Sequence, residues 1–210
     1  MIARTLEYAL SHQGEIAAAL WQHLELSFSA LGIAILICVP LGILTSHVRG
    51  VSSGISNTVN TLRVIPSLAV LFLIIPFFGL TFWAAVFALT LLALPPVLIN
   101  TDAAFRTIDP FLMEAAVGMG MTPGQRLRRV EIPLALPTIL SGIRTAGVEV
   151  IASATLAAFI GTGGLGIFIT RGLALYDTAI LLTGAIPIAA LTLTFEGTLE
   201  GIEHFMRKGR

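Results

Sequence analysis

The sequence predicts an all-α integral membrane protein with five transmembrane helices. Hydrophobic residues make up 56% of the 210 residues and charged residues only 11%, whereas a soluble domain carries about 25% charged residues. So few charges cannot solvate the surface of a globule of this size, so the chain belongs in a bilayer. Five apolar stretches are candidates to cross the hydrocarbon core, and most positive charges lie on one side of them. We expect one transmembrane domain over residues 1–210.

The N-terminal segment, residues 1–23, precedes the first apolar stretch. It lacks the compact apolar region of a cleavable signal peptide and carries Glu7 and Glu15 instead. We expect an amphipathic surface helix that leads into the first span, with Trp21 near the membrane interface.

The five predicted spans differ in length and in proline content. The second is short, the third ends with Pro95-Pro96, and the fifth contains Pro187. Prolines are tolerated in a membrane bundle when neighbouring helices satisfy the freed backbone groups, so packing kinks and flexing of the bundle both account for them. The spans are expected at residues 24–46, 64–79, 81–100, 137–160 and 178–198.

The basic residues indicate how the chain is oriented. If the N-terminus is outside, only Arg4 and Arg171 lie in outer segments. The positive-inside rule therefore predicts an outer N-terminus, a cytoplasmic C-terminus and one long cytoplasmic connection at residues 101–136. The basic residues on the cytoplasmic side are Arg49, Arg63, Arg106, Arg126, Arg128, Arg129, Arg207, Lys208 and Arg210.

Motifs for catalysis or nucleotide binding are missing from the sequence. It has no G-x-x-x-x-G-K-[ST] phosphate loop. Gly161, Gly163 and Gly166 fit the dinucleotide pattern G-x-G-x-x-G, but they follow a predicted membrane helix instead of a strand. We therefore expect no catalytic residue and no cofactor in this chain, and the zero net charge gives no indication of a nucleic-acid partner.

Metal ligation is not expected either. The single cysteine, Cys38, lies inside an apolar run and reads as a buried or lipid-facing residue. The histidines lie at span ends or in the tails, without the spacing of metal ligands: His12, His23, His47 and His204.

The predicted cytoplasmic connection is unusual for a membrane protein because it reads as two helices. Asp109-Pro110 is typical of an N-cap followed by proline in the first helical position, and a short helix of small and apolar residues follows. After Thr122-Pro123-Gly124, a second, basic helix is expected to run to Pro133. This helix–turn–helix exposes enough apolar surface to require a partner.

The same connection resembles the EAA motif of binding-protein-dependent ABC importer permeases. The family pattern is Glu-Ala-Ala, three residues, Gly, nine residues, then Ile-x-Leu-Pro. This chain has Glu114-Ala115-Ala116, Gly120 and Val130-x-Ile132-Pro133, so it keeps every spacing with Val and Ile in place of Ile and Leu. The resemblance implies a type I importer permease with five transmembrane helices, like the methionine permeases, in which this short helix is the cytoplasmic coupling helix.

By this resemblance, the coupling helix docks into a groove on an ATPase subunit. Small alanine and glycine residues permit close packing, while Glu114 and the arginines can pair with charges on the partner. The alternative is an interfacial helix whose arginines meet anionic lipid head groups. The residues expected at the ATPase contact are Glu114, Ala115, Ala116, Gly120, Met121, Thr122, Pro123, Gln125, Arg126 and Pro133.

Further segments resemble the osmoprotectant subgroup of these permeases, whose importers carry glycine betaine, carnitine, choline or related quaternary ammonium compounds. The most discriminating are IPSLA in the second span and IGTGGLG before the last span. A permease for another solute, such as an amino acid, is an alternative within the family. An ion-coupled secondary transporter is a second alternative, which predicts inverted repeats and several ion ligands near the midplane.

The resemblance also implies partners and a location. ATP and Mg²⁺ would bind to a separate pair of ATPase subunits, and a second permease subunit, identical or paralogous, would complete the pathway. A periplasmic or lipid-anchored solute-binding protein would deliver the solute. The expected location is the bacterial inner membrane, with lipid around the spans.

Two kinds of residue are candidates for the translocation path. Glu149 and Arg144 are charged residues inside the fourth span, where charges are costly and mark a pathway or an ion pair. Ser67, Phe77 and Trp83 lie around the second and third spans, and aromatic rings there would suit a quaternary ammonium group. A structural partner for Glu149 and anchoring of the aromatic residues at the interface are the alternatives.

Overall fold

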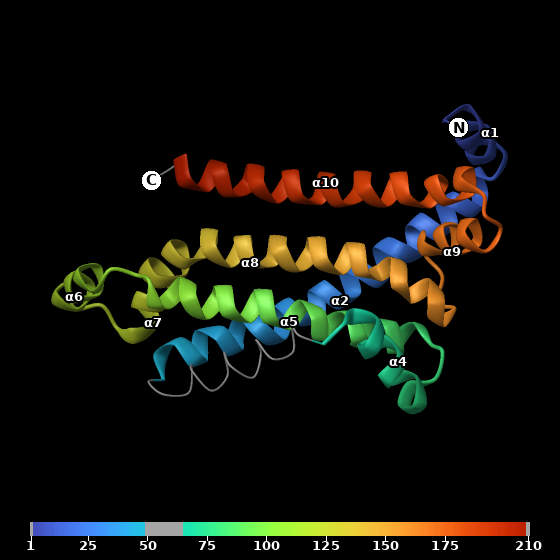
Figure 1. Ribbon diagram of the computed structural model, residues 1–210. Helices are drawn as coiled ribbons and strands as arrows, with labels where there is room; N and C mark the ends of the chain where they lie inside the picture. The colour runs from blue at the N-terminus through green and yellow to red at the C-terminus, as the bar shows by residue number, and fades with distance from the viewer. Residues whose placement is uncertain (1, 49–64, 209–210) are drawn as a thin grey trace.

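The computed structural model describes residues 2–48 and 65–208, with the exception of the side chain of Arg207. The described chain is helical, without a strand. Long helices run roughly side by side, and the N-terminal helix α1 lies at the opposite end of the bundle from the end of α10 (Figure 1). The short helix α6 lies at the same end as the C-terminus, while α4 and α9 lie toward the other end.

Four helices of the described chain are long and apolar enough to cross a membrane. They contain α2 (Gln13–His47), α5 (Phe82–Arg106), α8 (Ile132–Ser153) and α10 (Thr178–Lys208). The predicted first, third, fourth and fifth spans correspond to these helices. The all-α membrane fold is therefore confirmed.

The predicted second span, 64–79, contains a short helix, as its sequence indicates. Residue 64 lies outside the described chain, and α4 (Ser67–Phe78) has only 12 residues, which gives about 18 Å of helix against ~30 Å of hydrocarbon. The helix begins after Pro66, whose extended ψ of 134° is not helical. It ends at Gly79, where φ is 67°. Proline and glycine therefore limit α4 on both sides, although its composition is that of a membrane helix.

The first span begins earlier than predicted. Helix α1 (Ile2–Ser11) is separate and amphipathic, as expected, but α2 starts at Gln13 and so includes residues 13–23 of the predicted surface segment. The third span also continues past Pro95-Pro96 to Arg106. Both differences have one cause. Packing against neighbouring helices stabilises a helix through residues of low helix propensity and through prolines.

The helices before and after the fourth span are continuous with it. Short α7 (Pro123–Arg126) passes through the π-helical turn η1 (Leu127–Glu131) into α8, and α8 ends in the 3₁₀ turn η2 (Ala154–Ile160). The prediction that the basic helix ends at Pro133 is wrong. The π turn lies directly before Pro133, where the missing N–H would otherwise interrupt an α-helix. The helix of the predicted fourth span therefore begins inside the predicted connection, 101–136.

Small residues allow the long helices to approach closely. Ala30 and Ala34 of α2, Ala85 and Ala88 of α5, and Ala146 of α8 are all fully buried in the largest hydrophobic cluster. Helices α2, α5 and α8 share this core, and α10 packs on the other side of α8. Small side chains at helix contacts are typical of membrane bundles, where van der Waals packing drives association.

Candidate functional site

The predicted coupling helix is present as α6 (Pro110–Gly118). Asp109 caps it, since its carboxylate accepts a hydrogen bond from the Phe111 N–H at 2.9 Å, and Pro110 occupies the first turn as predicted. Ala116 is buried, whereas Glu114 and Ala115 are exposed. The apolar residues Phe111, Leu112, Val117 and Met119 are also exposed, Phe111 by 75%.

A Schellman motif ends α6. The Gly120 N–H donates to the Val117 carbonyl at 2.9 Å, and the Met121 N–H donates to the Ala116 carbonyl at 3.1 Å. Gly120 has a φ of 76° and open space around its Cα. The motif therefore requires glycine for its backbone conformation and not for close packing.

The next helix begins with a reciprocal cap. The Gln125 N–H donates to the Thr122 hydroxyl at 3.3 Å, and the Thr122 N–H donates to the Gln125 side-chain oxygen at 2.9 Å. Pro123 is the first residue of α7. Together, α6, the Gly120 turn and the start of α7 form a rigid exposed surface, which we call the coupling surface (residues 109–126). It contains all of the predicted ATPase-contact residues except Pro133, which lies inside the long helix.

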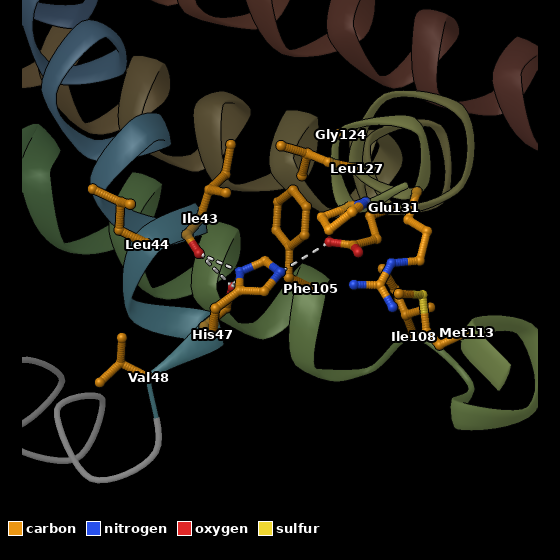
Figure 2. Close-up of a pocket in the computed structure, with 13 residues that line it drawn as sticks. Ile43, Leu44, His47, Val48, Phe105, Ile108, Met113, Gly124, Leu127 and Glu131 are labelled. Atoms are coloured by element: carbon orange, nitrogen blue, oxygen red, sulfur yellow. Dashed lines mark hydrogen bonds and ion pairs between the residues drawn. The ribbon is translucent and has the colours of Figure 1, made fainter. Parts of the chain in front are cut away.

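The base of the coupling surface is tied to the end of α2. The His47 Nε2 lies 3.0 Å from the Glu131 carboxylate of the π turn, and Glu131 is only 5% exposed. Figure 2 shows this pair beside a hollow of ≈ 570 Å³, lined by apolar residues such as Phe105 and Leu127 and also by Arg126. The sequence placed His47 at the end of a span and gave no indication of Glu131, because no local signal connects two residues that are 84 positions apart.

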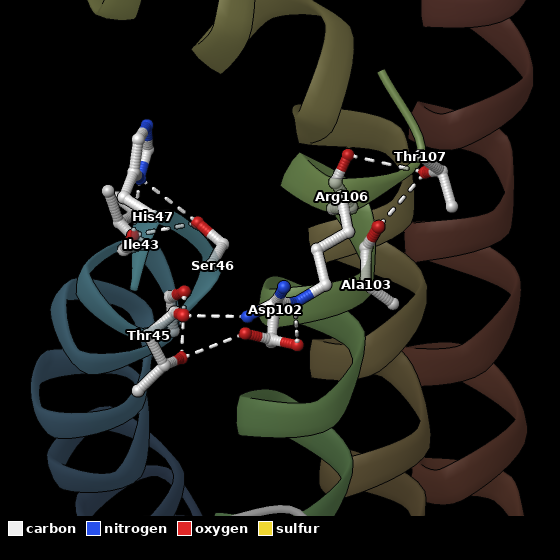
Figure 3. A network of polar contacts seen from close by, with 10 residues as sticks. Ile43, Thr45, Ser46, His47, Asp102, Ala103, Arg106 and Thr107 are labelled. Carbon is white, nitrogen blue, oxygen red and sulfur yellow. Dashed lines mark hydrogen bonds and ion pairs between the residues drawn. The ribbon is translucent and has the colours of Figure 1, made fainter. Parts of the chain in front are cut away.

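A second polar network ties α2 to α5 at the same end (Figure 3). The buried carboxylate of Asp102 accepts hydrogen bonds from the Thr45 hydroxyl at 2.9 Å and the Arg106 Nε at 2.8 Å. Arg106 also donates to the Thr45 carbonyl at 2.7 Å, so it satisfies a backbone group at the C-terminal end of α2. Charge-assisted hydrogen bonds of this kind fix the ends of the two helices relative to each other.

The predicted translocation residues lie on several helices. Arg144 of α8 points to α10, where its side chain lies 3.7 Å from the Glu203 carboxylate and 3.9 Å from that of Glu200. Glu149, also on α8, is exposed. The structure thus gives Arg144 the role of a contact between two spans, and it places Glu149 on a different face of the same helix.

The other three predicted path residues belong to the region of α4 and α5. Ser67 begins α4 and is partly buried, while Phe77 and Trp83 are strongly exposed. Phe77 lines an apolar hollow of ≈ 340 Å³ together with Phe78 and Phe87. Ser67 and Trp83 do not line this hollow, so the structure of one chain does not gather the three residues around it.

Comparison with known proteins agrees with the fold and with the predicted family. Residues 38–208 match the family of binding-protein-dependent transport system inner membrane components. The chain is 45% identical to the carnitine transport permease protein OpuCB of Listeria monocytogenes, over 88% of this chain and 84% of that protein. It is 40% identical to the osmoprotectant import permease protein OsmW of Salmonella typhimurium, over 95% of each. It is 36% identical to the choline transport system permease protein OpuBB of Bacillus subtilis, over 92% and 89%.

Solved structures show the same fold. The structure of the MetNI methionine ABC transporter in inward-facing conformations superposes with a TM-score of 0.84 at 23% identity, over 93% of this chain and 98% of that chain. An amino acid ABC transporter with histidines gives 0.76 at 24% identity, over 93% and 95%. The helical fold, the EAA-like coupling surface and the family match agree, and the chain therefore belongs to the binding-protein-dependent transport system inner membrane components, the multi-pass permeases of ABC importers.

Proposed function

We propose that this chain is the translocation subunit of an ATP-driven importer for glycine betaine, choline, carnitine or related quaternary ammonium osmolytes. The similar proteins named as carnitine, choline and osmoprotectant permeases support this solute class, because they match most of the chain. The IPSLA and IGTGGLG segments support the same class. The proposed location is the bacterial inner membrane, with the N-terminus outside.

The observation that carries the proposal is the coupling surface. Its helix α6 is capped at both ends, yet Phe111, Val117 and Met119 remain exposed. A helix whose ends are fixed and whose apolar residues face away from the chain is suited to a groove on another protein. The partner is proposed to be an ATPase subunit, which binds ATP and Mg²⁺, since this chain has no phosphate loop.

The proposed mechanism is alternating access by two permease subunits, identical or paralogous. Closure of the ATPase dimer would move the two coupling surfaces, and a solute-binding protein would supply the solute from outside. Movement of the coupling surface reaches the spans by two routes in this chain. One is the continuous helix from α7 into α8, and the other is the contact of Glu131 with His47 at the end of α2. A ligand shifts a conformational equilibrium only through such differential contacts.

The first test is co-purification with a co-expressed candidate ATPase subunit. Val117→Asp places a charge on the exposed apolar face of α6, and we expect it to abolish the association because the charge would be buried unpaired in the partner's groove. Phe205→Asp is the matched control, because Phe205 is equally apolar and 81% exposed but belongs to α10. Association of the ATPase with both variants alike, or with neither variant nor the wild type, would contradict the proposal.

The second test addresses the solute. The complete transporter is reconstituted in liposomes with its binding protein, and ATP-dependent uptake of labelled choline, carnitine, glycine betaine and methionine is compared. We expect uptake of at least one quaternary ammonium compound and none of methionine. Uptake of methionine alone would leave the importer assignment intact and replace the solute. Uptake driven by an ion gradient without ATP would favour a secondary transporter instead.

A further inference from the structure

The turn between α9 (Gly166–Ala174) and α10 holds a tyrosine in a backbone conformation that favours glycine. Tyr176 has a φ of 54° and is the only non-glycine residue of the described ranges with a positive φ. Its N–H donates to the Leu173 carbonyl at 3.3 Å, and the Asp177 N–H donates to the Gly172 carbonyl at 2.9 Å. These are the two hydrogen bonds of a Schellman motif, in which glycine is the usual residue at this position.

The Tyr176 ring is not used to build the core. Tyr176 is 97% exposed, and its neighbours Leu173 and Leu175 are also more than half exposed. The ring therefore adds no burial, while the Cβ makes the left-handed conformation less favourable than it would be with glycine. At the end of a membrane span, such side chains contact either the lipid interface or a partner protein, so the polar groups around them decide between the two.

Several contacts hold the turn rigidly. Gly172 packs so closely on α10 that a Cβ there would lie 2.5 Å from the Leu181 nitrogen. The Asp177 carboxylate accepts a hydrogen bond from the Ala179 N–H at 2.8 Å, and it also forms an ion pair with Arg4 of α1 at 3.3 Å. A surface that is ordered before binding loses little conformational entropy when a partner arrives.

The position of the turn indicates what kind of partner fits. It precedes the first residue of the last span, at the end of the bundle that holds α1 and lies away from α6 (Figure 1). A hollow of ≈ 390 Å³ beside Tyr176 is lined by Arg4, Asp177 and Thr178 as well. An aromatic centre with a charged rim resembles a protein–protein interface, whereas acyl chains would leave these charges unsolvated.

We propose that Tyr176, flanked by Leu173 and Leu175, is an anchor through which the solute-binding protein docks on the outer face of this permease. The inference rests on the proposed function, which supplies the water-soluble partner and the outward orientation of this end. The rim is polar, with Arg4 paired to Asp177, and it therefore suits the hydrated surface of a soluble protein. A second permease would approach along the sides of the spans instead.

The test measures binding of a purified candidate solute-binding protein, without any lipid anchor, to the permease–ATPase complex in nanodiscs. Tyr176→Gly is the informative variant because glycine suits the backbone of the turn and removes only the side chain. We expect its Kd to rise at least about tenfold, as for an aromatic hot spot. Tyr176→Phe, which keeps the ring, should stay within about threefold of the wild type.

Two controls separate docking from folding. Phe205→Ala removes a comparably exposed aromatic ring from the opposite end of the bundle, and its Kd should stay within about twofold of the wild type. Tyr176→Gly should retain its ATPase subunit and its thermal midpoint, so that any loss of affinity is not due to unfolding.

The outcomes distinguish this inference from the proposed function. If the wild type binds and Tyr176→Gly binds equally well, Tyr176 is not the anchor and the importer assignment stands. If the wild type retains its ATPase but does not bind the binding protein in any nucleotide state, both the anchor and the proposed partner are wrong.

Discussion

The two ends of the bundle use the same turn with different residues. At the end with α6, a Schellman motif places Gly120 in the left-handed conformation, and at the end with α9 the same motif places Tyr176 there. The ion pairs differ as well. Asp102 and Glu131 are buried at the first end, whereas the Arg4 side chain at the second end is 74% exposed. The first end is therefore built for rigidity, and the second keeps an exposed side chain where the fold favours glycine.

The largest expected effect concerns the buried network. Asp102→Ala leaves Arg106 and the Thr45 hydroxyl without their shared acceptor, so we expect it to lower the free energy of unfolding by about 3 kcal/mol. Unfolding in mixed detergent micelles measures this change. A loss no greater than that of Arg4→Ala would remove the contrast between the two ends.

A smaller effect is expected at Gly120. Gly120→Val forces a β-branched residue into a φ of 76°, at a cost of about 2 kcal/mol to the turn. The variant should therefore lose affinity for the ATPase, measured by co-purification. Gly124→Ala is the matched control, because Gly124 lies in the same surface with open space and no positive φ. An equal loss of ATPase affinity in both variants would show that the backbone conformation of Gly120 does not account for the loss.

At Tyr176, in contrast to Gly120, introducing glycine is expected to favour the turn. Tyr176→Gly should be more stable than Tyr176→Ala by about 1 kcal/mol, because both variants lack the ring but only alanine keeps a Cβ in the left-handed conformation. Thermal midpoints of the two purified variants give this comparison. A more stable alanine variant would mean that the backbone of the Tyr176 turn changes with the side chain.

The smallest effect is expected from the exposed ion pair. Arg4→Ala should change the free energy of unfolding by less than about 0.5 kcal/mol, because exposed pairs are largely solvated. In 1 M salt, where the screening length is about 3 Å, even this difference should disappear. A large loss that persists at high salt would mean that Arg4 acts through packing of α1.

Local sequence signals predicted one part of this structure well. Asp109-Pro110 predicted the start of α6, and apolar length predicted the four long helices. These features depend on residues close together in the chain. The second apolar stretch was predicted to be short, and α4 is shorter still because Pro66 and Gly79 limit the helix on both sides.

Contacts between residues far apart in the chain could not be predicted from the sequence. His47 and Glu131 are 84 residues apart, and nothing beside either residue indicates the other. Arg144 was predicted near the solute path because a charge in a span is unusual, but the same reasoning applies to an ion pair between helices, which is what Glu203 provides. A pathway that needs a second permease subunit also has no signature within one chain.

The continuity of Pro123–Ile160 has a mechanical consequence. A helix of 38 residues is about 57 Å long at 1.5 Å per residue, so a tilt of 5° about its centre would displace each end by about 2.5 Å. One end of this lever carries the coupling surface, and the other ends at Gly161, beside the glycine turn that the Gln22 side chain contacts at Gly164. The π turn lies within this helix, near the end that carries the coupling surface. A displacement at Pro123 would therefore reach the glycine turn through the helix itself, without any chain of side-chain rearrangements between them.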